Sequence, residues 1–400
     1  MIYLASGGFW LSATQGVLLV SGLLFTLVLA NTLTKDAYGI YRLILAVAGI
    51  LGVITLPGLN TALVRSVARG EASVLRNITR TRIGWGFLGT IICAAVALYY
   101  FTNGNIELAI AFGILGVFLP FFDTFTTAVS DLQGRKEFKK SSLYTVVITV
   151  LATLVCVIAA LVTKNVFAVL ISYFGAYSLL RFIVYLIVAS KRSEGAAQPA
   201  LLAQIRTYGK HLSAMNVLTN AASNIDKVII FYMLGPASLA LYAIAISVPE
   251  QLKNVFRNII PLLTPKLAVL SHDATKRALP TIYTHLLLLF LLALFVSIIY
   301  ILLAPTLFAL LLPAYGEALL YSQIFALSIG VSVVFLPLGI FQAQERTKEL
   351  YLLNTVHPIV QILLYIGLIS LFGLWGAISA WIMGRLFNLG YTLFLFHRAY

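Results

Sequence analysis

Charged residues are scarce in this chain, and their scarcity excludes a soluble protein. Only 10% of the 400 residues are Asp, Glu, Lys or Arg, whereas 61% are hydrophobic. Soluble domains carry roughly 25% charged residues. We therefore interpret the chain as an integral membrane protein. Since one membrane span needs ~20 apolar residues, the apolar runs and their short connections use nearly the whole sequence and leave no soluble domain.

Cysteine is almost absent, and the motifs of enzyme chemistry are missing. Cys93 and Cys156 both lie in apolar runs without CxxC spacing, which predicts buried thiols and no disulfide framework. There is no GxxxxGK[ST] phosphate loop, no HExxH spacing and no metal-ligand cluster. We therefore expect no cofactor, no metal and no enzymatic reaction.

What the sequence does contain is a series of apolar runs that predict twelve transmembrane helices. Prolines interrupt several of them, Pro57 and Pro120 included, and permit kinks. The first run is interpreted as a retained helix, not a signal peptide, because no basic residue precedes it. Its abrupt start suggests that a few leading residues are missing. The runs cover residues 9–31, 40–64, 83–101, 108–130, 143–163, 165–189, 212–234, 237–261, 281–303, 318–343, 350–371 and 373–396.

Lys and Arg fall into every second gap between these runs. Nineteen of the 27 basic residues lie in one set of gaps, two in the opposite set and six inside the runs. Short loops rich in Lys and Arg stay cytoplasmic, so both termini are predicted in the cytoplasm. The net charge of +14 comes in small groups at helix ends, which favours contact with anionic lipid and no nucleic-acid partner.

The chain shows signs of an internal duplication. Its longest connection, 190–211, is small, polar and proline-containing, and it separates six runs from six. On either side, Leu33 to Tyr41 (LTKDAYGIY) and Leu234 to Tyr242 (LGPASLALY) align at a constant offset. We expect an all-α protein of two six-helix lobes, 1–205 and 206–400, repeated in parallel around a central cavity. Chance similarity of one short corner is the alternative.

Nine ionisable residues lie inside the predicted spans. A charge facing lipid costs ~2.5–3.5 kcal/mol on the insertion scale, so these side chains must face protein or water, although Arg42 lies near enough to a span end to reach the interface. Pairing of Glu250 with Lys253, and of both Asp residues with other cations, leaves an excess of positive charge, which favours a phosphate or diphosphate ligand. The nine are Arg42, Arg181, Lys227, Lys253, Arg257, Arg385, Asp123, Asp226 and Glu250.

Polar side chains recur at helical spacing in four spans of the second half, and each set falls on one helical face. They are predicted to line a cavity; interhelical hydrogen bonding is the alternative. The four sets are Asn216, Asn220, Ser223 and Lys227; Glu250, Lys253, Asn254 and Arg257; Asn354, His357 and Gln361; and Trp381, Arg385 and Asn388.

Three segments carry a resemblance to a known family: LTKDAYGIYRLILAVAGILGVITLPGLNTALVRSVARG (33–70), SNIDKVIIFYMLGPASLALYAIAISVPEQL (223–252) and LLAPTLFALLLPAYGEA (302–318). Over nearly its whole length the chain resembles the polysaccharide-biosynthesis branch of the multidrug/oligosaccharidyl-lipid/polysaccharide exporter superfamily. These are the bacterial flippases of lipid-linked oligosaccharides, including O-antigen flippases. The resemblance rests on a pattern of helices and corners and not on an invariant motif.

The resemblance implies a bacterial inner-membrane protein that delivers an undecaprenyl-diphosphate-linked repeat unit to the outer face by alternating access. Its protein partners would be the polysaccharide polymerase and the chain-length machinery. A cationic lumen is typical of such flippases, and Lys227, Lys253, Arg257 and Arg385 would fill that role here, with Arg181 and Arg42 as further candidates. Asp123, Asp226 and Glu250 are candidates for ion coupling.

Two other functions fit parts of the pattern. A cation-coupled multidrug exporter of the same superfamily would make Asp123 and Asp226 dominant for cargo. A membrane-embedded glycan polymerase or ligase would act outside and would need a long external loop, whereas the external gaps of this chain are all short.

Overall fold

The computed structural model describes residues 2–71, 74–192, 199–257, 272–331, 335–344 and 346–399, and within these ranges every regular element is a helix. The predicted all-α class is thereby confirmed. The chain divides into two compact units, Met1–Asn224 and Ile225–Tyr400. The division falls later than the expected boundary between 205 and 206 because α9 packs against α3 of the first unit. That each half acts as one lobe of a carrier stays a prediction.

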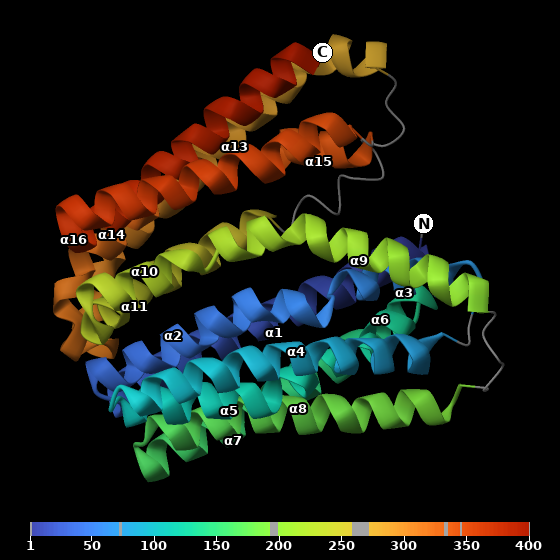
Figure 1. The fold of residues 1–400 in the computed structure, drawn as a ribbon. Helices are drawn as coiled ribbons and strands as arrows, with labels where there is room; N and C mark the ends of the chain where they lie inside the picture. The colour runs from blue at the N-terminus through green and yellow to red at the C-terminus, as the bar shows by residue number, and fades with distance from the viewer. Residues whose placement is uncertain are drawn as a thin grey trace. The chain divides into compact units, whose positions relative to one another are not determined.

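The first unit is a bundle of long helices, drawn from blue to yellow-green in Figure 1. Within it α4 packs on α5, α7 packs on both α1 and α8, and α3 packs on α9. Its helices are α1 (Ile2–Thr32), α2 (Lys35–Leu51), α3 (Gly58–Ala68), α4 (Leu75–Thr102), α5 (Ile106–Phe122), α6 (Thr127–Gly134), α7 (Phe138–Thr163), α8 (Val166–Ser190) and α9 (Pro199–Ala222).

Two of the predicted spans in this unit are broken helices. The span 40–64 is divided into α2 and α3 by the 3-10 turn Gly52–Thr55 and by Leu56, whose φ is 54°. Pro57 follows directly, and it has no N–H to continue the helical hydrogen bonds. The span 108–130 is divided into α5 and α6 by Asp123 and the 3-10 turn Thr124–Thr126, shortly after Pro120. Each break frees backbone carbonyls that need other partners.

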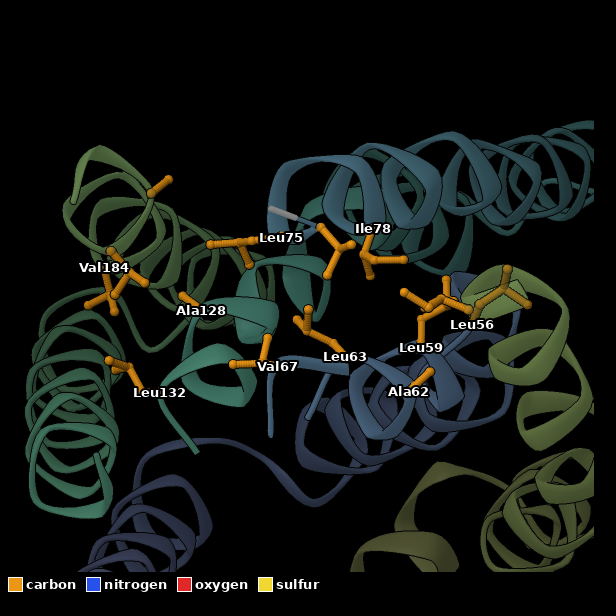
Figure 2. Packing of buried hydrophobic residues seen from close by; sticks show 14 of the residues in the cluster. Leu56, Leu59, Ala62, Leu63, Val67, Leu75, Ile78, Ala128, Leu132 and Val184 are labelled. Carbon is orange, nitrogen blue, oxygen red and sulfur yellow. The ribbon is translucent and has the colours of Figure 1, made fainter. Parts of the chain in front are cut away.

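Apolar side chains around α3 form the best-defined core of the first unit. Leu59 and Leu63 of α3 are fully buried and pack with Ile78 of α4 and Ala128 of α6 (Figure 2). On the side facing α9, an added Cβ at Gly58 would lie 2.5 Å from the carbonyl oxygen of Gly209. Only glycine therefore permits this close approach, and it holds the second half of the broken span in place.

The second unit contains the remaining described helices, drawn from yellow-green to red in Figure 1. α16 is interrupted at Gly373, where φ is 58° and ψ is −132°. The amide of Gln361, before the interruption, donates to the carbonyl of Ala380 after it, so the halves are antiparallel, as the runs 350–371 and 373–396 predict. The helices are α10 (Ile225–Leu234), α11 (Pro236–Arg257), α13 (His272–Leu311), α14 (Leu319–Leu327), α15 (Phe335–Ala343) and α16 (Thr347–Ala399).

Among the described residues, eight helices are long and apolar enough to cross a membrane, which agrees with a multi-pass membrane protein. Three predicted spans are not among them. The run 212–234 is broken by a turn at Ser223 and Asn224, 237–261 extends into residues outside the described ranges, and 318–343 is shared between α14 and α15. The count of twelve crossings stays a prediction.

Both corners that suggested a duplication are short turns between two helices, but their backbone conformations differ. In the first, the Thr34 hydroxyl accepts a hydrogen bond from the N–H of Ala37 and caps the start of α2. In the second, Gly235 has a φ of 88° and leads into α11. The closing tyrosines, Tyr41 and Tyr242, are both buried within their own units.

Candidate functional site

The second unit brings three charged side chains from two helices into one cluster. On α11, Lys253 lies one turn after Glu250 and pairs with its Oε2, which confirms the pairing predicted from the i, i+3 spacing. Arg385, in the second half of α16, pairs with Oε1 of the same carboxylate. The side chains of Lys253 and Arg385 are 16% exposed and that of Glu250 is 29% exposed. We call these three residues the Glu250 cluster.

An aromatic wall supports the Glu250 cluster. The guanidinium carbon of Arg385 lies 3.5 Å from the ring centroid of Trp381, one turn earlier on α16. Trp381 in turn packs edge to face on Phe325 of α14, with 4.7 Å between the ring centroids. A guanidinium over an indole face is an attractive arrangement that leaves the edge of the fork free to bind oxygen. The wall therefore orients Arg385 toward Glu250.

A second acid in this unit is closed off from solvent. Asp226 of α10 has a side chain only 5% exposed and pairs with Lys227 at 3.1 Å. The hydroxyl of Tyr242 donates to its other oxygen at 2.8 Å. Lys227 also interacts electrostatically with Glu250, so the pair adjoins the Glu250 cluster. With three cations and two acids described, this part of the unit retains a positive excess.

The other polar positions predicted in the second unit have varied surroundings. Gln361 is buried and its amide bonds to Ala380 across the hairpin of α16, which matches the interhelical hydrogen-bond alternative. His357 is partly buried near Arg385, Asn354 is exposed, and Asn388 accepts a hydrogen bond from Thr392. Asn254 and Arg257 belong to α11, but their side chains lie outside the described residues.

The polar stripe predicted for the run 212–234 is interrupted. Asn216 and Asn220 lie on α9 in the first unit, whereas Lys227 lies on α10 in the second, after the turn at Ser223 and Asn224. The prediction of one continuous helical face is wrong because it assumed an unbroken helix. Asn216 is exposed, and Asn220 is partly buried.

In the first unit, Asp123 and Arg181 form a separate ion pair of 2.8 Å at the break between α5 and α6. Arg181 also donates to the carbonyl of Phe122 and stacks on the rings of Phe122 and Tyr177. The Asp123 side chain is 46% exposed. Arg42 lies 6.0 Å from the ring centroid of Tyr38, one turn earlier on α2.

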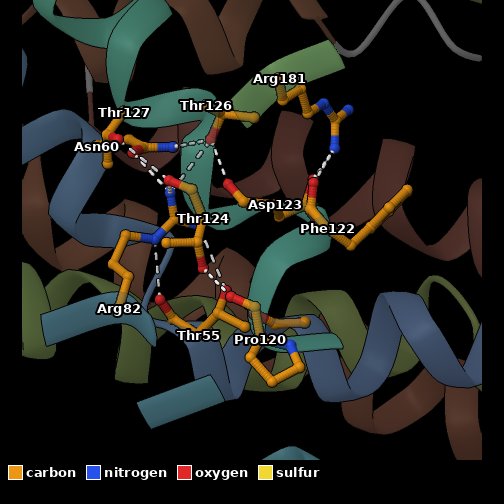
Figure 3. Close-up of polar contacts among 11 residues, drawn as sticks. Thr55, Asn60, Arg82, Pro120, Phe122, Asp123, Thr124, Thr126, Thr127 and Arg181 are labelled. Carbon is orange, nitrogen blue, oxygen red and sulfur yellow. Dashed lines mark hydrogen bonds and ion pairs between the residues drawn. The ribbon is translucent and has the colours of Figure 1, made fainter. Parts of the chain in front are cut away.

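Arg82 is a buried cation that the sequence reasoning placed wrongly, in a cytoplasmic gap. It lies inside α4 and is only 1% exposed. Figure 3 shows its guanidinium between the two helix breaks, where it donates to the carbonyl of Thr55 at 3.0 Å and to that of Thr124 at 3.3 Å. It also donates to Asn60 Oδ1 at 2.9 Å and to Thr126 Oγ1 at 3.1 Å.

A sequence signal for Arg82 did exist. Its helix begins at Leu75, earlier than the expected span 83–101, and its buried face runs through Ile78, Thr79 and Arg82 to Gly86 and Gly89. This spacing of three and four residues places the arginine on the same buried face as the two glycines. An arginine that continues a stripe of small residues is a candidate for burial against neighbouring helices.

Comparisons with known proteins place the chain in a family. A family model described as polysaccharide biosynthesis protein matches residues 28–314. No curated protein gives a significant match.

Several solved structures share the fold. One is the lipid II flippase MurJ in an inward closed conformation, with a TM-score of 0.72 and 13% identity over 96% of this chain and 86% of that chain. Another is an outward-facing multidrug resistance MATE family transporter of the MOP superfamily, with a TM-score of 0.64 and 16% identity over 98% and 94%. A MOP superfamily transporter from Pyrococcus furiosus gives 0.61 and 14% over 98% and 95%.

Proposed function

The chain belongs to the polysaccharide biosynthesis protein family, and from this premise we propose that it flips an undecaprenyl-diphosphate-linked oligosaccharide repeat unit. The cargo moves from the cytoplasmic to the outer face of a bacterial plasma membrane by alternating access. A polysaccharide polymerase and chain-length machinery would then receive the delivered repeat unit.

One observation carries this proposal: Lys253 and Arg385 converge on one point inside a membrane-embedded unit, with a single carboxylate between them. Cations in such an environment are costly unless they bind an anion. A diphosphate offers several oxygens to a guanidinium fork and an ammonium group. The cluster is also partly exposed, as a binding site must be, and Lys227 adds positive charge beside it.

The acidic residues support the multidrug-exporter alternative less well. Asp226 is buried and already bound by Lys227 and Tyr242, so a cationic drug would have to displace both. Asp123 is half-exposed but is paired with Arg181. The cations are therefore better placed for an anionic cargo than the acids are for a cationic one.

A charge-removal series tests the proposal. In a strain that lacks the gene, plasmid-borne Lys253→Gln, Arg385→Gln and the double variant are compared with the parent for surface polysaccharide and for lipid-linked repeat units retained at the cytoplasmic face. We expect each single variant to reduce surface polysaccharide and the double variant to abolish it, while the intermediate accumulates.

Arg80→Gln is the matched control because Arg80 is an exposed basic residue on α4. It should leave surface polysaccharide at the parental level. Membrane quantities of all variants are measured by immunoblot. Normal surface polysaccharide from a double variant that is present at the parental level would exclude the proposal.

A further inference from the structure

Glu250 occupies the place that an anionic ligand would take. Its two carboxylate oxygens are divided between two cations, Oε2 for Lys253 and Oε1 for Arg385. The cations come from different helices, so the carboxylate bridges α11 and the second half of α16. A phosphate oxygen and a carboxylate oxygen accept the same charge-assisted hydrogen bonds. A diphosphate that reaches these cations must therefore compete with Glu250.

The two acids of the second unit differ in how easily they can leave their partners. The Glu250 side chain is 29% exposed, and its described bonds are to the two cations. The shorter Asp226 side chain is 5% exposed and is also held by the hydroxyl of Tyr242. Glu250 therefore has more rotatable bonds and a larger exposed fraction than Asp226, whose carboxylate has an additional hydrogen bond.

On this geometry, which rests on the proposed function, we propose that Glu250 is a displaceable internal counter-anion. In the empty site it neutralises Lys253 and Arg385, and it gives them up when the diphosphate of the cargo enters. In the empty protein, Glu250 supplies the carboxylate that both cations share at membrane depth, where isolated charge is costly. It also lowers the affinity for diphosphate, because binding must first break two ion pairs, and so it favours release after translocation.

Ligand-dependent thermal unfolding of the purified full-length protein in detergent tests the exchange, with inorganic diphosphate as the probe. Glu250→Gln removes the competing charge. We expect this variant to unfold at a lower temperature than the parent when diphosphate is absent, because two cations lose the carboxylate that they share. We expect diphosphate to restore the lost stability and to bind at least about tenfold more tightly than it binds the parent, equivalent to about 1.4 kcal/mol.

Two further variants keep the result decisive. Glu250→Asp retains the charge with a shorter reach, and its diphosphate affinity should lie between those of the parent and Glu250→Gln. Asp226→Asn removes an acid that holds Lys227 and not Lys253 or Arg385, and it should strengthen diphosphate binding less than Glu250→Gln does. If the parent binds diphosphate and Glu250→Gln or, should that variant not fold, Glu250→Asp binds it no more tightly than the parent does, the exchange is wrong and the proposed function stands.

Failure of the proposed function has a different signature. If the parent and Glu250→Gln both ignore diphosphate, and adding Lys253→Gln and Arg385→Gln to Glu250→Gln changes nothing in the ligand response, the cations do not form an anion site. Both proposals would then be overturned together.

Discussion

Tyr41 in the first unit and Tyr242 in the second close the same repeated corner, yet they have different partners. The sequence offset that aligns these tyrosines also aligns Phe25 with Asp226. In the first unit the ring of Tyr41 packs edge to face on Phe25, with 6.0 Å between the ring centroids. In the second, the hydroxyl of Tyr242 donates to Asp226. An apolar contact in one unit thus corresponds to a hydrogen-bonded acid in the other.

The same offset aligns Gly49 with Glu250 and Gly52 with Lys253. In the first unit, an added Cβ at Gly49 would lie 2.8 Å from the amide nitrogen of Asn224, so glycine there permits close packing at the end of α9. In the second unit the aligned position carries the shared carboxylate of the Glu250 cluster. The comparison indicates that aligned positions permit close helix packing in the first unit and carry charged side chains in the second.

Each unit also contains an arginine with little exposed surface, and the surroundings of the two arginines differ. Arg82 is 1% exposed and is held by neutral oxygens at two helix breaks, and it has no ion pair within the described ranges. Arg385 is 16% exposed and is held by a carboxylate and an indole face. Arg82 satisfies carbonyls that no ligand can reach. Arg385 binds a carboxylate that, in our proposal, the diphosphate of the cargo replaces.

The largest effect should come from Arg82→Gln. Loss of the guanidinium removes the donor to the Thr55 carbonyl and to Asn60 Oδ1, and one of the two donors to the Thr124 carbonyl. A buried acceptor without a donor costs about 1–3 kcal/mol. We expect a fall of several kcal/mol in the free energy of unfolding, measured by thermal unfolding in detergent. The exposed Arg80→Gln should change it by less than about 0.5 kcal/mol. Equal stabilities of Arg82→Gln and Arg80→Gln would mean that Arg82 does not have the structural role that distinguishes it from Arg385.

A smaller effect is expected from Arg385→Lys. Lysine keeps the charge beside Glu250 but loses the planar contact with Trp381, which is worth about 0.5–2 kcal/mol. Trp381→Leu should remove the same contact. In a double-mutant cycle measured by thermal unfolding, Trp381→Leu should therefore cost less stability in the Arg385→Lys background than in the parent. Strictly additive effects would mean that the aromatic wall does not support Arg385.

The smallest effect concerns an exposed ion pair in the first unit. The hydrogen bond from Lys140 at 2.5 Å lowers the pKa of Glu137, just before α7. A lowered pKa in the folded state stabilises the fold above the unfolded pKa of about 4.3. This contribution is lost as the pH falls through the lowered value.

Glu137→Gln should therefore be slightly less stable than the parent at pH 7, and the difference should vanish in acid. The effect is small because the Lys140 side chain is 66% exposed and screened by water. Thermal unfolding of both proteins between pH 3 and 7, in steps of about one pH unit, measures this difference in stability. If the stability difference between the parent and Glu137→Gln grew in acid, the pKa of Glu137 would be raised in the folded protein and not lowered.

Local patterns predicted much of this structure. Hydropathy predicted the membrane class, and the i, i+3 spacing predicted the pair of Glu250 and Lys253 because both residues lie on one continuous helix. The stripe from Asn216 to Lys227 failed for the converse reason, since a turn separates its members. Arg82 was missed because the predicted span was limited to apolar residues and therefore began at residue 83. The helix begins earlier, and its buried face includes Arg82.

By itself, the sequence determined that the chain lies in a membrane and forms long helices, because hydropathy and backbone hydrogen bonding act over neighbouring residues. It also determined most of the charged residues that the long helices carry, although it missed Arg82. Only the tertiary structure decided that Arg385 shares the carboxylate of Glu250 and that Arg82 joins two helix breaks. These partners are far apart in the chain, so their meeting depends on how the helices of each unit pack, which no local pattern encodes.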